Sequence, residues 1–104
     1  MRMLMRIQIP TEAGNAALKD GSLQRVMQES LGSLKPEAMY LTTVDGCRGG
    51  IVVFNLEDVS QIPAIAEPLF MSLHAKIELT PCFTPQELEQ AGPSVQQAIQ
   101  TYGS

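Results

Sequence analysis

Hydrophobic and polar residues alternate along several short segments of the chain, and a period of two is typical of strands with one buried face. The clearest case is residues 2–9, where Met3, Met5, Ile7 and Ile9 share one side. The dipeptides Asp-Gly and Gly-Gly at residues 45–50 predict the tip of a hairpin between two β-rich runs. Four strands are therefore expected, over residues 2–9, 38–44, 50–56 and 75–79.

Between these strands the spacing of apolar residues becomes helical. Leu23, Val26, Leu31 and their neighbours form one stripe within residues 12–34, which Gly21 is expected to break or kink. A second helix is predicted over residues 61–72. The sequence Thr-Pro-Gln-Glu from Thr84 is a capping box that starts a short helix, and a last helix follows it.

The order of elements, β-α-β-β-α-β, predicts an α+β fold of the ferredoxin-like type, in one domain over residues 1–104. Right-handed crossovers place both helices on one face of a four-stranded antiparallel sheet, with the first and third strands central. Residues 83–104 form a helical C-terminal extension. The expected core comprises Met5, Ile7, Ile9, Met39, Leu41, Val52, Phe54, Leu56, Ala75, Ile77 and Leu79.

The opposite face of the sheet is too apolar at its centre to be left in water. Strand parity places on it Leu4, Arg6, Gln8, Tyr40, Thr42, Val44, Ile51, Val53, Asn55, His74, Lys76 and Glu78. A large apolar patch of this kind usually marks a contact site. We expect a second copy of the chain to cover it in a homodimer; the C-terminal helices could fold back over the same face instead, or both could contribute.

The stretch from Gly49 to Thr84, GGIVVFNLEDVSQIPAIAEPLFMSLHAKIELTPCFT, resembles the dimeric α+β barrel superfamily, and within it a small uncharacterised bacterial family. The resemblance implies a ferredoxin-like subunit whose sheet faces that of a second subunit. Members of the superfamily include monooxygenases acting on aromatics, muconolactone-isomerase-like enzymes and dye-type haem peroxidases. No catalytic pattern of those groups maps onto this chain, so the resemblance bears on fold and dimerisation only.

Composition excludes some classes of function. The net charge is −4, and the seven Lys and Arg residues are scattered, so no basic stripe is present for nucleic acid. No apolar run approaches the roughly 20 residues that a transmembrane helix needs, and the first residues lack the apolar region of a signal peptide, so a cytoplasmic location is expected. Cys47 and Cys82 match no zinc spacing and are expected to be free thiols; no metal or cofactor is predicted.

Seven side chains are candidates for chemistry, each with a plain structural alternative. His74, the only histidine, is a weak candidate for a general base, and an exposed or interface imidazole is the alternative. Cys47 beside Arg48 could be an activated thiol, and Arg48 could clamp a carboxylate; an inert loop thiol and a solvated ion pair are the alternatives. The candidate ligand-binding residues share the open sheet face: Arg6, Tyr40, Asn55, His74 and Lys76.

Two classes of function follow from these residues. The first is a non-catalytic homodimer that acts as an interaction or small-molecule-binding module. It is suggested by the apolar, uncovered sheet face and by the lack of a complete set of catalytic residues. The second is a cofactor-independent monooxygenase or isomerase acting on a small hydrophobic substrate, with His74 as base and with Tyr40 and Arg6 orienting a substrate oxygen. A redox-sensitive protein using Cys47 is a third, weaker hypothesis.

Overall fold

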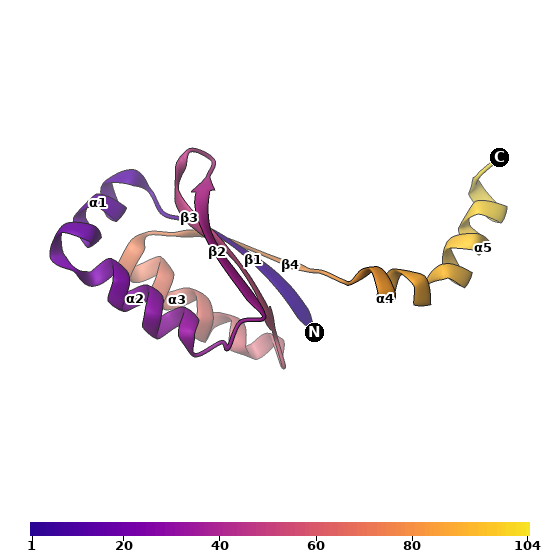
Figure 1. Cartoon of the computed structure of the whole chain (residues 1–104), viewed down its shortest axis with the longest axis horizontal. Helices are drawn as coiled ribbons and strands as arrows, with labels where there is room; N and C mark the ends of the chain where they lie inside the picture. The colour runs from indigo at the N-terminus through magenta and orange to yellow at the C-terminus, as the bar shows by residue number, and fades with distance from the viewer.

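A computed structural model describes all 104 residues, and the fold is α+β with one four-stranded antiparallel sheet (Figure 1). The sheet order is β2-β3-β1-β4, so β1 and β3 are central. Three helices, α1 to α3, lie on one face of the sheet. The elements are β1 (Arg2–Gln8), α1 (Thr11–Asp20), α2 (Ser22–Gly32), β2 (Ala38–Val44), β3 (Cys47–Asn55), a 3-10 turn (Val59–Gln61), α3 (Ile62–Leu73), β4 (Lys76–Pro81), α4 (Pro85–Gln90) and α5 (Gly92–Tyr102).

The expected break in the first helical region is confirmed at Gly21. Gly21 has φ of 81°, a left-handed conformation in which glycine carries no side-chain penalty, and it ends α1 and precedes α2. The Asp20 side chain accepts a hydrogen bond from the Ser22 N–H at 2.8 Å, which satisfies one free donor at the start of α2. The chain therefore folds these residues into two short helices.

The β2–β3 hairpin is tighter than the sequence predicted. Its turn is only Asp45-Gly46, both with positive φ, 50° and 82°, as a two-residue hairpin turn requires. Strand β3 begins at Cys47, two residues after Asp45. The prediction that Cys47 and Arg48 lie in an exposed hairpin tip is thus wrong, because both residues pair with β2.

The core lies between the sheet and helices α1 to α3. The central strands contribute four fully buried side chains, which pack against apolar residues of all three helices: Met5, Ile7, Val52 and Phe54. Met39 and Leu41 of β2 were expected in this core, but 46% and 72% of their surfaces are exposed. The helices cover the central strands and leave the β2 edge uncovered. The alternation of residues in β2 therefore predicted the side on which Met39 and Leu41 lie, but not how far they are buried.

The C-terminal residues 83–104 form an arm that projects from the end of β4 (Figure 1). The arm gives the molecule its length, 58 Å against 28 and 20 Å in the other directions. No residue after Ala75 is buried. The capping box of α4 is confirmed, with both of its hydrogen bonds between Thr84 and Glu87. The arm does not fold back over the sheet of its own chain.

Candidate functional site

The sheet face opposite the helices, here called the open face, carries an apolar centre. In the register, Leu4 of β1 lies beside Val53 of β3, and Ile51 of β3 lies beside Tyr40 of β2. Leu4, Ile51 and Val53 are half-buried only by their own neighbours, and Tyr40 is 69% exposed. No element of the chain covers these side chains, because all three packed helices lie on the other face (Figure 1).

An ion-pair cluster borders this apolar centre at the hairpin end of the open face. The Arg6 guanidinium contacts Asp45 at 3.0 Å and Glu78 at 3.4 Å. Its hydrogen bonds with Asp45 raise the pKa of Arg6 further above its ordinary value. A polar hollow of about 280 Å³ opens here, lined by Arg6, Gln8, Val44, Asp45, Lys76 and Glu78. Because two carboxylates already occupy the guanidinium, Arg6 is poorly placed to bind an anionic ligand.

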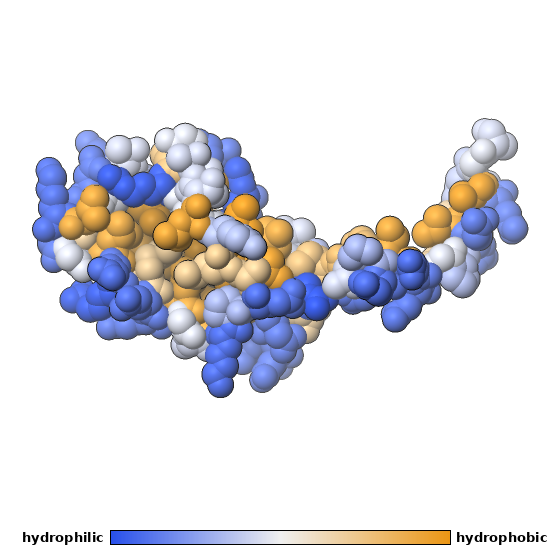
Figure 2. Space-filling model, viewed as in Figure 1, coloured by the Kyte–Doolittle hydropathy of each residue, from blue (hydrophilic) through white to orange (hydrophobic).

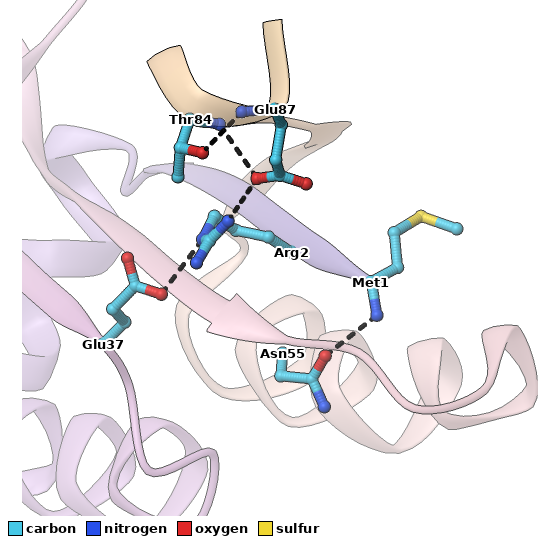
Figure 3. A network of polar contacts seen from close by, with 6 residues as sticks. All are labelled: Met1, Arg2, Glu37, Asn55, Thr84 and Glu87. Carbon is cyan, nitrogen blue, oxygen red and sulfur yellow. Dashed lines mark hydrogen bonds and ion pairs between the residues drawn. The ribbon is translucent and has the colours of Figure 1, made fainter. Parts of the chain in front are cut away.

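A second polar network lies at the other end of β1 and fixes the root of the arm (Figure 3). Arg2 donates to Glu37 at 3.0 Å and to Glu87 of α4 at 2.7 Å. The pKa of Glu87 lies below its ordinary value, mainly because its carboxylate accepts a hydrogen bond from the Thr84 N–H. The Thr84 side chain lowers this pKa further, and Arg2 has a smaller effect in the same direction. Arg2 has the same parity as Leu4 and Arg6, so the arm leaves the domain on the side of the open face.

An apolar groove of about 690 Å³ runs between α2 and the uncovered strand β2. Figure 2 shows the hydrophobic surface over these elements and on the arm. The groove is lined by Leu18, Leu23, Met27, Met39 and Leu41, among others, and the one charged residue in its lining is Arg48. The size and the apolar lining are those of a binding site. The groove was not predicted, because the sequence placed Met39 and Leu41 inside a closed core.

Arg48 and Cys47 sit at the α1 end of the hairpin without forming a reactive pair. The Arg48 Nη1 donates to Asn15 Oδ1 of α1 at 2.9 Å, and no carboxylate pairs with it. The Cys47 thiol is half-buried and lies 3.8 Å from the Thr11 hydroxyl. These contacts attach the hairpin to α1, and they place no base beside the thiol.

The structure does not bring the five predicted ligand-binding residues together. Arg6 and Lys76 line the polar hollow, whereas Asn55 accepts a hydrogen bond from the terminal nitrogen of Met1 at 2.8 Å (Figure 3). Tyr40 and His74 line neither the groove nor the hollow. The placement of His74 at the start of the fourth strand is wrong, because it is the exposed C-cap of α3, with φ of 53°.

No group of three His, Cys, Asp or Glu residues lies close enough to hold a metal ion. No helix has the length and apolar character needed to cross a membrane. A scan against models of known protein families gives no match, and a search of curated proteins gives none either. The site must therefore be interpreted from its geometry.

Proposed function

We propose that the protein is a homodimeric interaction module in which the open faces of two ferredoxin-like subunits pack together. The observation that carries this proposal is the apolar centre formed by Leu4, Ile51 and Val53, which no helix of the chain covers. Burying such a patch is favourable by about 25 cal/mol per Å² of apolar surface. The sheet order β2-β3-β1-β4 supports the ferredoxin-like assignment, and with it the pairing of sheets found in dimeric α+β barrels.

The polar groups of the open face suit an interface. Two-fold interfaces combine an apolar core with a polar rim. Here the Arg6 cluster and the Arg2 network lie at the two ends of the apolar centre, with their charges already paired within one chain. Neither cluster would bring an unpaired guanidinium into the contact, so the cost of removing these two cations from water stays low. Lys76, which lines the hollow beside Arg6, is the one cation at this end without an ion-pair partner.

The monooxygenase or isomerase hypothesis has less support. It requires His74, Tyr40 and Arg6 around one substrate, but no described pocket holds more than one of them. The Arg6 guanidinium is bound to Asp45 and Glu78. A small hydrophobic ligand fits the α2–β2 groove better than it fits any surface near His74.

Sedimentation equilibrium of the wild type and of Val53→Glu tests the proposal. The wild type should behave as a species of twice 11.3 kDa, whereas Val53→Glu, which forces an unpaired carboxylate into the contact, should be a monomer. Met71→Glu is the matched control, because Met71 is 77% exposed on α3 and should leave the dimer intact. A monomeric wild type, or a dimer that Val53→Glu leaves unchanged, would refute pairing through the open face.

A further inference from the structure

The arm carries an apolar surface that nothing in its own chain covers. In α5, Val95, Ile99 and Tyr102 recur at intervals of four and three residues, which places them on one side of the helix. Phe83 and Leu88 are further apolar side chains of the arm, nearer to β4 in the sequence. All five side chains are exposed, Phe83 by 67% and Tyr102 by 84%. A short helix of this kind gains its stability in water mainly from packing its apolar side against a partner.

The α2–β2 groove is the matching uncovered surface, but the arm of the same chain leads away from it. The groove follows the β2 edge of the sheet, whereas the arm continues from β4, the opposite edge. Figure 1 shows the arm extending away from α2 and from the hairpin. The only substantial packing of α5 is against α4.

From these observations we infer that the two arms exchange: the α5 helix of one protomer lies in the α2–β2 groove of its partner. This inference rests on the proposed pairing of open faces. When two sheets face each other about a two-fold axis parallel to their strands, the β4 edge of one lies against the β2 edge of the other. The Arg2–Glu87 contact holds the root of the arm on the open-face side, from which the arm would pass around the partner's β2 edge to the groove on the helix side.

The chemistry of the two surfaces agrees with this exchange. Helix α5 contains no charged residue between Gly92 and Tyr102, and the lining of the groove contains one charged residue, Arg48. The uncharged helix can therefore enter the groove without bringing a charge into it, and the one cation already there, Arg48, donates to Asn15 of its own chain. Glu87 and Glu89 remain on α4, outside the part of the arm that would lie in the groove.

The area available is sufficient for a stable contact. The contact is made by Val95, Ile99 and Tyr102 of α5, of which Val95 and Ile99 are about half exposed and Tyr102 is 84% exposed. Since an aromatic side chain buries about 150–250 Å² and an aliphatic one less, the three together would remove roughly 250 Å² from water. The groove surface opposite them contributes about as much again. Two symmetric contacts then reach on the order of 1,000 Å², the size that a specific interface has to exceed, before the open faces are counted.

Disulfide trapping between two differently tagged full-length chains tests the exchange. One chain carries Ile99→Cys and the other Leu41→Cys, and both carry Cys47→Ser and Cys82→Ser, so that only the engineered thiols can react. Mild oxidation of the mixed dimer should give a disulfide between the two tags. The control pair combines Ile99→Cys with Met71→Cys, which is as exposed as Leu41 but lies outside the groove, and it should give several-fold less product.

Three results would overturn the inference. If a chain that carries both Ile99→Cys and Leu41→Cys forms the disulfide within itself more readily than the mixed pair forms it between chains, the arm folds back onto its own groove. If the groove pair reacts no faster than the Met71 control, the arm does not lie there. If no disulfide forms in a proven dimer, the arm faces some other partner.

A pair of charge variants separates this inference from the proposed dimer. Ile99→Glu should weaken the dimer at least tenfold, while Gln97→Glu, on the opposite side of the same helix, should not. If Val53→Glu dissociates the dimer but Ile99→Glu does not, the open faces pair and the arms do not exchange. If the disulfide forms although Val53→Glu leaves the dimer intact, the arms exchange and the proposed face is wrong.

Discussion

Removal of the arm should leave the stability of the isolated subunit almost unchanged and should weaken the dimer. We consider a chain ending at Cys82, which lacks residues 83–104. Every buried residue is retained, since the last of them is Ala75. In a monomeric Val53→Glu background the free energy of unfolding should therefore change by no more than about 0.5 kcal/mol, the usual size of a surface effect.

In the wild-type background the same truncation should weaken the dimer. The apolar side chains of each α5 helix would bury roughly 250 Å², worth about 6 kcal/mol at 25 cal/mol per Å² before any cost is subtracted. Ordering the arm and fixing it against the groove consume most of that amount. We expect a net loss of at least about 1.4 kcal/mol per dimer, which is a tenfold increase in the dissociation constant.

The assay is a double-mutant cycle of urea unfolding with and without the arm, in each background and at several protein concentrations. Concentration must be varied because dimerisation itself raises apparent stability. The reasoning fails if truncation destabilises the Val53→Glu monomer by about 2 kcal/mol or more, because the arm would then pack on its own domain. It also fails if truncation has the same small effect in both backgrounds, since the arm would then contribute nothing to the dimer.

Three further outcomes follow from local geometry. Gly49→Ala should cost more than about 2 kcal/mol in urea unfolding, because its Cβ would collide with the Ile7 carbonyl oxygen, whereas Gly32→Ala, which has open space, should be neutral or slightly stabilising. His74→Gly should raise the melting temperature by a few degrees, because φ of 53° favours glycine; a loss of stability would contradict the assigned capping role. The lowered pKa of Glu87 means that its contribution to stability is fully present above the ordinary pKa of a glutamate and is lost as pH falls through the lowered pKa, so the helical circular dichroism of the arm should decrease on acidification; a signal that stays unchanged until the carboxylate is fully protonated would argue against the capping box.

The sequence by itself determined most of the elements and the direction in which their side chains point. Alternation in β1 needs only the pleat of a strand, so Met3, Met5 and Ile7 could be assigned to the core from their parity alone. The Gly21 break and the Thr84–Glu87 capping box are also local, because each depends on hydrogen bonds and backbone angles within a few residues. The α+β class follows from the order of these elements.

Only the tertiary structure decided how far each face is covered. Parity placed Met39 and Leu41 on the helix side of β2, but burial depends on where α2 crosses the sheet, and α2 stops short of that edge. Likewise, the arm was recognisable as two helices, yet its projection away from the domain depends on the packing of the whole chain. The apolar groove and the unpartnered α5 both arise from this incomplete coverage, which no local pattern of residues encodes.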